Sequence, residues 1–389
     1  VPTKYLVEDL IDRARSKGFP ALAQSMFMSP SLKAPYFIQP LVFTTLDSYT
    51  MNYYRAPVAE LETIAEGLSL GHSEVARYAA ITAVNVFDEY HLFTPGDSPS
   101  HDPRFESKAW TTLAITISHL IQVGAPVILE TATPRGDAIR QVREISGPEE
   151  VFEITYDYTG EKSSRTKVVS DRDFASSSLE REIKTELEED SLSRSLGRVL
   201  SEEGEDFILV VANTVREAIE VYKGFRGDGR AFVLHSRLTI GDRARRIREV
   251  KQALEQRKPL LLVSTQVIEV GANLDFRILV TSAAPITSLV QRAGRVGRGV
   301  YLGDEREFRI VIAYSQAGRR GELYDGVYLA EAVDNTVQAI RRVLDREMEF
   351  SWKIPSSRSI EWNGRKLVPY NRVVDEVYGG QQLEIDREL

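Results

Sequence analysis

Short apolar runs alternate along the chain with longer segments in which apolar residues recur every three or four positions. In the first half the runs are PLVFTT (40–45), AVNVFD (83–88) and PVILETA (126–132). Segments such as KYLVEDLIDRARSKG and KAWTTLAITISHLIQVG lie between them and follow the helical period. Continuous apolar runs are typical of strands buried on both faces, and their alternation with amphipathic helices predicts a parallel α/β layer.

A second set of runs begins after an acidic stretch and predicts another sheet of the same kind. Its members are FILVVAN (207–213), RAFVLHS (230–236), PLLLVST (259–265), RILVTSA (277–283) and EFRIVIAYS (307–315). The first two are each followed by a helical pattern, TVREAIEVYK and then TIGDRARRIREVKQALEQ. The fold class is therefore α/β, with two tandem doubly wound parallel-sheet domains.

The 389 residues divide at a polar segment that we expect to be a mobile linker. The predicted pieces are a first domain over 1–157, a linker over 158–195, a second domain over 196–318 and a small C-terminal extension over 319–389. The extension contains one good helical pattern, YLAEAVDNTVQAIRRVLDRE, and then irregular sequence.

Composition narrows the classes of protein without selecting one. The absence of cysteine excludes disulfides, thiolate zinc sites, cysteine-held iron–sulfur clusters and cysteine nucleophiles. No apolar window has the length of a membrane span, and the first residues do not form a basic-then-apolar signal. We expect a cytoplasmic protein with no membrane partner.

The formal net charge of −8 is unevenly distributed. Residues 182–206 hold nine acidic and three basic residues, a balance of −6, whereas 214–258 hold twelve basic and six acidic, a balance of +6. Phosphate binding needs a local positive surface rather than a positive average. The basic stretch fits a nucleic-acid contact and equally a solvated helix face.

Candidate chemistry begins at the end of the run 83–88, where Asp88, Glu89 and His91 follow apolar residues. Ligands of open α/β sheets bind beyond the carboxyl ends of the strands. An aspartate there can hold Mg²⁺ while the adjacent glutamate takes a proton from a nucleophilic water. A capping or salt-bridged cluster is the alternative.

The next run ends in LETATPRG and brings Thr131 and Thr133 to a neighbouring strand end. Their hydroxyls could relay the state of a ligand by hydrogen bonding. Because Thr133 precedes a proline, it is also a good start signal for the helix RGDAIRQVREI. Both roles could hold together.

The strongest signal is STQVIEVGANLDF (264–276) followed by SLVQRAGRVGRG (288–299). Offsets of four and three predict that Gln291, Arg295 and Arg298 share one face of a helix. Arginines that reach a phosphate from a second domain are worth about 10³–10⁵ in rate. A basic surface helix is the alternative, but it must explain why glycines weaken it.

Hydroxyl residues also follow several strand ends: Thr44, Thr45, Thr214 and Thr265. Singly each is typical of a helix cap. As a series on equivalent edges of two domains, they predict a track for the sugar-phosphate backbone of one strand.

In this order, the motifs resemble those of superfamily-two helicases, ATP-driven motors with two RecA-like domains. The resemblance runs from PTKYLVEDL through FTTLDS, DEYH, TAT, VVANT, STQVIEVGANLDF and QRAGRVGR, over roughly residues 1 to 315. LHSRLTIGDRARR and AAPITSLVQRAGRVGRG most resemble the stand-alone helicase of type I CRISPR interference, a DExH protein.

The resemblance implies ATP and Mg²⁺ as cofactors and roles for matching residues. Asp88 would hold Mg²⁺, Glu89 would activate water, and His91 would couple nucleotide state to domain closure. The remaining residues implied at the nucleotide are Thr131, Thr133, Gly271, Asp275, Gln291, Arg295 and Arg298. Those implied at the nucleic acid are Pro2, Thr3, Thr44, Thr45, Thr214, His235, Arg237 and Thr265.

The implied partners are single-stranded DNA, along which this family moves 3′ to 5′, a crRNA-guided surveillance complex and a separate HD nuclease. His101 and Asp102 lie in the proline-bracketed PGDSPSHDPRFE, and the few scattered histidines do not complete a two-metal nuclease site. The chain contains no GxxxxGK[ST] phosphate loop, which the family carries ahead of PTKYL. We expect a chain truncated before that loop, its first strand missing too, and inactive by itself.

Two other interpretations stay open. The parent protein could be another superfamily-two motor, for DNA repair or RNA remodelling; stimulation by single-stranded DNA and binding to a surveillance complex would discriminate. It could also be a non-catalytic RecA-like interaction module. Glu89, Arg295 and Arg298 together argue against a scaffold, which has no use for them.

Overall fold

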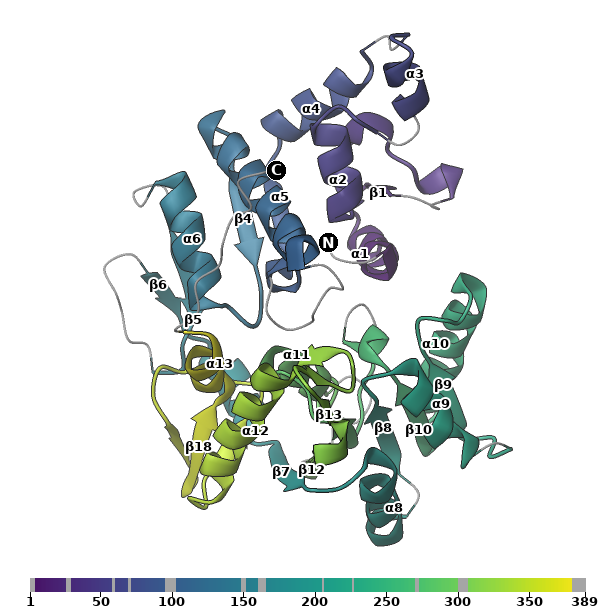
Figure 1. Ribbon diagram of the computed structural model, residues 1–389, viewed down its shortest axis with the longest axis vertical. Coiled ribbons are helices and arrows are strands. Elements are labelled where there is room, and N and C mark those ends of the chain that lie inside the picture. Colours follow the sequence, from purple (N-terminus) through teal and green to yellow (C-terminus); the bar gives the residue numbers. More distant parts are fainter. Residues whose placement is uncertain are drawn as a thin grey trace. The chain divides into compact units, whose positions relative to one another are not determined.

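A computed structural model describes residues 4–25, 29–57, 60–68, 71–94, 103–147, 152–159, 166–204, 206–225, 227–269, 273–299 and 307–379. The described residues up to 147 form one compact unit, and those from 152 to 379 form a second (Figure 1). Each unit is considered separately below.

The first unit holds two pairs of parallel strands and six helices among its described residues. β1 pairs with β2, and β3 pairs with β4. The runs at 40–45, 83–88 and 126–132 form strands, as the sequence predicts. In chain order the elements are α1 (Lys4–Ser16), β1 (Ala21–Gln24), β2 (Leu41–Thr44), α2 (Leu46–Tyr53), α3 (Leu61–Ala65), α4 (Ser73–Thr82), β3 (Asn85–Asp88), α5 (Pro103–Gln122), β4 (Val127–Glu130) and α6 (Gly136–Ser146).

The long helix α5 forms the centre of this unit's core. Its residues Trp110, Leu113, Ile117 and Leu120 recur at helical spacing and are almost completely buried. They form one hydrophobic cluster with side chains of α2, β3 and α6. This packing fixes the carboxyl ends of β3 and β4, which are register neighbours from Asn85 opposite Val127 onward.

The second unit is larger and contains a six-stranded sheet. Its elements are β5 (Glu153–Tyr156), β6 (Thr166–Val169), α7 (Arg172–Leu179), β7 (Glu182–Glu188), α8 (Leu192–Glu203), β8 (Phe207–Val211), α9 (Val215–Lys223), β9 (Ala231–Leu234), α10 (Ile240–Glu255), β10 (Leu260–Ser264), β11 (Ile278–Ser282), α11 (Ile286–Ala293), β12 (Glu307–Ala313), β13 (Arg319–Arg320), β14 (Leu323–Tyr324), β15 (Tyr328–Leu329), α12 (Ala330–Leu344), β16 (Glu349–Ser351), β17 (Ile360–Trp362), β18 (Arg365–Pro369) and α13 (Tyr370–Tyr378).

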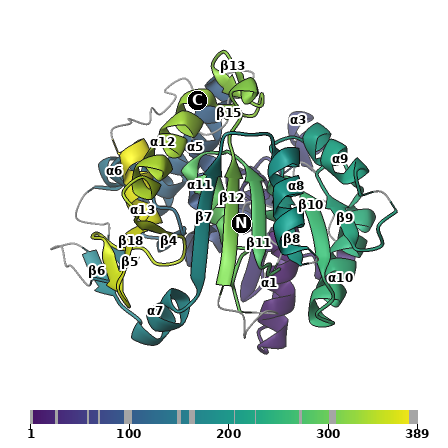
Figure 2. The ribbon, with the colours of Figure 1, turned by 90° about the horizontal axis from the view of Figure 1, so that it is seen from below.

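The sheet is parallel throughout, in the order β7-β12-β11-β8-β10-β9 (Figure 2). Alternate residues of each strand face opposite sides. On β8, Ile208 and Val210 pack with α8 and α9, whereas Leu209 and Val211 pack with α10, α11, α12 and α13. Burial on both faces is why the central strands β8, β10 and β11 are mostly apolar. The predicted doubly wound α/β class is confirmed.

Secondary structure also occupies the segment 158–195, which we expected to be a linker. It contains β6, α7 and β7, and β7 forms an edge of the sheet by pairing with β12. The segment is polar because carboxylates of β7 face arginines. Glu186 Oε2 lies 2.8 Å from Arg309 Nη2 and 2.8 Å from Arg198 Nη2. Charges are a usual feature of edge strands.

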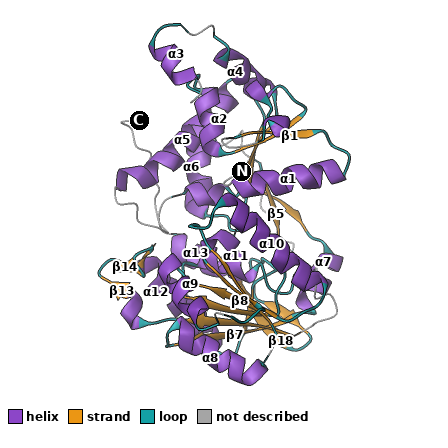
Figure 3. Cartoon of the chain, turned by 90° about the vertical axis from the view of Figure 1, so that its right-hand side faces the viewer, coloured by secondary structure: helices purple, strands orange, loops and turns teal. Residues whose placement is uncertain are grey.

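The expected C-terminal extension packs into the same core as the sheet. Phe350, Trp352 and Tyr370 belong to the hydrophobic cluster that includes β8, β10 and β12. Helices α12 and α13 therefore cover part of one sheet face, and Figure 3 shows α8 on one side of the sheet and α10 and α11 on the other. A small three-stranded sheet, β16-β18-β17, contacts α12 and α13. Among the residues described, no helix has both the length and the apolarity to cross a membrane.

Candidate functional site

The carboxylates of Asp88 and Glu89 mark the carboxyl end of β3. Glu89 adopts a left-handed backbone conformation, with φ 51° and ψ 44°, between the strand and a short 3₁₀ turn (Tyr90–Phe93). This conformation is uncommon for a residue with a side chain and costs on the order of 1 kcal/mol or more. The turn places both acidic residues at the strand end, where the sequence predicted them.

The electrostatics of this turn favour binding of a cation. Burial and the neighbouring Glu89 raise the pKa of Asp88. Glu89 Oε2 is buried and accepts no hydrogen bond from any described residue, although His91 Nδ1 lies 3.2 Å away. Paired oxygen ligands with unmet hydrogen-bonding capacity fit Mg²⁺, which prefers carboxylates and water.

His91 connects this turn to the next strand end. Its imidazole is almost completely buried, and Nδ1 is hydrogen bonded to Thr131 Oγ1 at 2.8 Å. Thr131 Oγ1 also accepts the backbone N–H of Thr133 at 3.0 Å. The predicted proximity of DEYH and TAT is therefore present in the structure, through one histidine and one hydroxyl.

The predicted helix cap at Thr133 is wrong. α6 begins at Gly136 with Arg135 as its N-cap, and Thr133 Oγ1 is buried without a hydrogen-bond partner among the described residues. Arg135 and Asp137 form a buried ion pair instead, with Arg135 Nη2 2.6 Å from Asp137 Oδ2. This ion pair lies at the start of α6, and the Thr133 hydroxyl does not cap the helix.

The prediction that Gln291, Arg295 and Arg298 share one helix face is also wrong. α11 ends at Ala293, and Arg295 and Arg298 lie in the loop that follows. Gly297 and Gly299 have φ values of 58° and 75°, so the chain turns away from the helix. We call residues 293–298 the arginine loop. The glycines of this segment permit the turn, which explains why residues that weaken a helix occur here.

Backbone hydrogen bonds tie the arginine loop to the segment before β11. Phe276 N donates to Arg295 O at 2.9 Å, and Gly297 N donates to Phe276 O at 3.1 Å. Arg298 N donates to Asp275 Oδ1 at 2.8 Å. Asp275 is completely buried, whereas the Arg298 side chain is exposed. The loop thus presents Arg298 from a fixed backbone, with Asp275 as its anchor.

Of the other two members of this predicted set, Arg295 lies in the loop and Gln291 lies just before it. Arg295 is almost completely buried, and its Nη2 donates to Glu269 O at 2.5 Å. Gln291, in the last turn of α11, has a buried Nε2 that donates no hydrogen bond within the described part of the chain. Unsatisfied buried donors are rare, and they are an expected feature of a site that awaits a ligand.

Arg292 is a structural residue that sequence reasoning did not single out. Its guanidinium is completely buried and donates hydrogen bonds within 2.8–3.1 Å. The acceptors are the Glu269 carboxylate, the Ser282 backbone carbonyl, and side-chain oxygens of Thr281, Asn213 and Tyr328. The motif QRAGRVGR thus contains two buried arginines, Arg292 and Arg295, and one exposed arginine, Arg298.

The residues predicted to contact nucleic acid have different environments. Thr45 and Thr214 cap α2 and α9, and Thr44 Oγ1 donates to Gln24 O at 2.6 Å. Thr265 and His235 are almost completely buried at the ends of β10 and β9, and Arg237 is exposed. Burial and the neighbouring arginines 237 and 243 lower the pKa of His235. Pro2, Thr3, Gly271, His101 and Asp102 lie outside the described residues.

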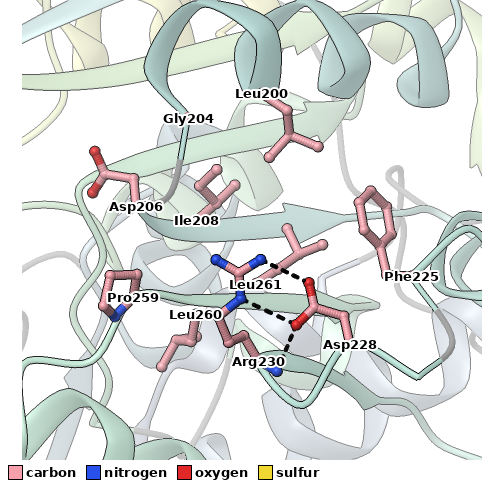
Figure 4. A pocket seen from close by; sticks show the side chains of 10 residues that line it. All are labelled: Leu200, Gly204, Asp206, Ile208, Phe225, Asp228, Arg230, Pro259, Leu260 and Leu261. Atoms are coloured by element: carbon pink, nitrogen blue, oxygen red, sulfur yellow. Dashed lines mark hydrogen bonds and ion pairs between the residues drawn. The ribbon is translucent and has the colours of Figure 1, made fainter.

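A pocket opens at the opposite end of the second unit's sheet (Figure 4). It lies where β8 and β10 begin, and its lining includes Asp206, Phe225 and Arg230. Arg230 is occupied by an ion pair with Asp228 at 3.0 Å. Because parallel sheets bind ligands at the carboxyl ends of their strands, this pocket is separate from the candidate site.

Comparisons with known proteins show what the chain is similar to. Residues 204–300 match the family described as CRISPR-associated nuclease/helicase Cas3, C-terminal. The CRISPR-associated helicase Cas3 of Thermoproteus tenax is 26% identical over 347 residues, 88% of this chain and 49% of that protein. The CRISPR-associated nuclease/helicase Cas3 of Methanothermobacter thermautotrophicus is 32% identical over 164 residues, 41% of this chain and 19% of that protein.

Solved structures show the same fold. A crystal structure of T. fusca Cas3-ADP matches with a TM-score of 0.66 and 18% identity, over 100% of this chain and 46% of that one. A chain in a CRISPR RNA-guided surveillance complex, pre-nicking, matches with a TM-score of 0.61 and 18% identity, over 100% and 45%. This chain spans about half or less of the length of these relatives. Together these findings show that the chain is similar to Cas3 helicases, in sequence most clearly over residues 204–300, and shares the fold of their two tandem RecA-like domains.

Proposed function

We propose that the protein to which this chain belongs is an ATP-dependent helicase that moves along single-stranded DNA in CRISPR interference. The supporting observation is the turn after β3, where Asp88 and the strained Glu89 lie beside the hydrogen-bonded pair His91 and Thr131. A buried, unmet carboxylate oxygen next to a second carboxylate is unfavourable in a merely structural cluster. It is useful where Mg²⁺ and a nucleotide bind.

Each residue of the turn then has a chemical role. Asp88 would hold Mg²⁺, which supplies charge neutralisation on the phosphates when bound. Glu89 would take the proton of the attacking water, because its Oε2 is not engaged by another donor in the described structure. His91 and Thr131 would report the state of the nucleotide between the two strand ends.

The second unit would supply positive charge to the γ-phosphate. Arg298 is exposed on the arginine loop, and Gln291 and Arg295 lie at its start. Guanidinium groups that approach the transferring phosphoryl group stabilise charge in the transition state. In the helicases that the chain resembles, a phosphate loop completes such a site.

Nucleic acid would follow the strand ends that carry hydroxyl groups. Thr44, Thr45, Thr214 and Thr265, with His235 and Arg237, would contact the sugar-phosphate backbone without reading bases. By likeness to the relatives, the partners would be a crRNA-guided surveillance complex and a separate HD nuclease, the direction 3′ to 5′, and the compartment the cytoplasm.

The test is Glu89→Gln in a polypeptide that carries a phosphate loop together with this chain. The amide keeps the size of the side chain but cannot take a proton. We expect ATP binding within about two-fold of the original and a loss of DNA-stimulated turnover of at least about 10³-fold. Glu144→Gln, on the exposed side of α6, is the matched control and should leave turnover unchanged.

Measurements of ATP affinity and of phosphate release decide the outcome. Turnover that survives Glu89→Gln would remove the general base from the proposal. Absence of DNA-stimulated ATPase in the unsubstituted polypeptide would contradict the function itself. Stimulation by RNA in preference to single-stranded DNA would favour a different superfamily-two motor.

A further inference from the structure

Two basic side chains from outside the helicase motifs contact the arginine loop. Lys353, just after β16, donates from Nζ to the carbonyl oxygen of Ala293 at 3.3 Å and also to that of Val296. Arg181, between α7 and β7, donates from Nη1 to the carbonyl oxygen of Gly297 at 2.9 Å. Together they donate hydrogen bonds to three carbonyl groups of this six-residue loop.

The contacts of Lys353 have a clear electrostatic reason. Ala293 is the last residue of α11, and the final carbonyls of a helix carry partial negative charge with no partner inside the helix. An ammonium group is the complementary donor. Burial lowers the pKa of Lys353 to about 7, with Arg298, Arg181 and Arg295 acting in the same direction and Asp275 opposing them.

That shift shows that the position is unfavourable for a cation. Burial of an ammonium group beside several guanidinium groups costs free energy unless hydrogen bonds offset it. The carbonyls of the loop are the acceptors that do so here. The lysine is therefore tied to the conformation of the loop, because any movement of residues 293–296 would leave its buried Nζ without these acceptors.

Arg181 fits the other end of the loop closely. A Cβ added to Gly299 would overlap the Arg181 guanidinium, so glycine at this position permits the approach. The cavity lined by Arg181 and Lys353 measures only about 20 Å³, space for roughly one water molecule. Both cations donate hydrogen bonds to carbonyl oxygens of the loop.

We propose that Lys353 and Arg181 are positioning residues, which fix the backbone of residues 293–298 and so direct Arg295 and Arg298. Asp275 and Phe276 hold the same loop from the segment before β11. The region after residue 318 thereby acquires a function, since it supplies one of the two donors. The effect of these two residues on catalysis rests on the proposed function. Their effect on the backbone of the loop does not depend on it.

Amide hydrogen exchange, measured on the 389-residue chain, tests directly whether Lys353 and Arg181 fix the backbone of the arginine loop. The variants are Lys353→Met, Arg181→Met and the double variant, with Lys366→Met as control because Lys366 is an exposed lysine of the same region. We expect exchange of the Gly297 and Arg298 amides to become at least about ten-fold faster in the double variant, with each single variant intermediate. Lys366→Met should not change it.

Amides of β8 and β10 report whether each variant is folded. Unchanged exchange at Gly297 and Arg298 in a folded double variant would overturn the proposal. If methionine at 353 prevents folding, Lys353→Arg takes its place, because arginine keeps a donor at this position. Lys353→Arg should preserve most of the protection of the Gly297 and Arg298 amides against exchange. Full loss of this protection in the folded Lys353→Arg variant would contradict the proposal that residue 353 fixes the loop.

Kinetics then separate positioning from simple stability. In a polypeptide that also carries a phosphate loop, Lys353→Met should lower kcat for ATP about ten-fold and change KM less than two-fold. Lys353→Arg should restore part of kcat. A fall in kcat with no change in loop exchange would refute positioning. If no variant and no unsubstituted polypeptide hydrolyses ATP, the proposed function fails while the exchange result still decides this inference.

Discussion

The imidazole of His91 and the hydroxyl of Thr131 are hydrogen bonded at 2.8 Å, which joins the turn after β3 to the end of β4. The two residues are forty positions apart in the chain. Glu89 Oε2 lies 3.2 Å from the same ring nitrogen. A change at the carboxylate can therefore reach the neighbouring strand end through a single side chain.

Thr131→Val tests this connection. Valine keeps the shape of threonine and removes the hydroxyl, so His91 Nδ1 and the Thr133 N–H both lose a partner. We expect about ten-fold lower DNA-stimulated kcat with ATP affinity nearly unchanged, because the relay and not the binding site is altered. Thr82→Val, in an exposed position at the end of α4, is the control. Full DNA stimulation in Thr131→Val would argue against a relay.

Arg298→Ala should separate catalysis from DNA binding. The side chain is exposed and the backbone is anchored by Asp275, so its removal should leave the loop in place. We expect kcat to fall at least about 100-fold, because an arginine finger is worth about 10³–10⁵ in rate, with little change in DNA affinity. Both quantities are measured on the same preparation, by phosphate release and by DNA titration.

The reverse pattern is expected for Arg237→Ala, because Arg237 is exposed and is one of the residues proposed to contact the sugar-phosphate backbone. DNA affinity should fall similarly for all sequences while kcat at saturating DNA is retained. Equal losses of kcat and DNA affinity in Arg298→Ala would indicate a folding defect instead of a missing charge stabiliser.

Arg292→Met should destabilise the second unit. The completely buried guanidinium is 2.8 Å from the Glu269 carboxylate, and Arg292→Met breaks this buried ion pair together with the other hydrogen bonds of the guanidinium. We expect a loss of about 3–5 kcal/mol in the free energy of unfolding, measured with urea. Arg245→Met removes a surface pair and should cost no more than about 1 kcal/mol. A similar, small loss in both variants would contradict the core role of Arg292.

Glu217 should make the second unit less stable as the pH rises to neutrality. Burial, with the nearby Asp325 carboxylate, raises the pKa of Glu217 to about 7. The folded state therefore binds a proton that the unfolded state loses near pH 4.5. Its stabilising contribution is complete below that pH and disappears as the pH rises through about 7.

Urea unfolding between pH 4.5 and 8 measures this dependence. Glu217→Gln should flatten it, since glutamine cannot titrate but can still accept a hydrogen bond from Ser282, whose Oγ lies 3.2 Å from both carboxylate oxygens. Glu220→Gln, on the exposed side of the same helix, should leave the slope as it was. If the free energy of unfolding of Glu217→Gln depended on pH as steeply as that of the unsubstituted protein, another titratable group would be responsible for the dependence.

The order of elements was predictable because it depends on local patterns. Runs that become β8, β10, β11 and β12 are mostly apolar, since both faces of the sheet are covered. The acidic turn at Asp88 and Glu89 was predictable for a related reason, since polar residues that directly follow a buried strand lie at its carboxyl end. β7 escaped prediction because its charges are balanced by arginines from other elements.

The sequence by itself determined the α/β architecture, the strand ends that carry chemistry and the likeness to superfamily-two helicases. Only the tertiary structure decided that α11 stops at Ala293, that Arg292 is core while Arg298 is exposed, and that Lys353 reaches Val296 from 57 positions away. The physical reason is the distance along the chain over which each kind of interaction acts. Hydrophobic periodicity and turn residues act over a few positions, whereas burial and hydrogen bonds to a loop depend on which distant segments pack against it.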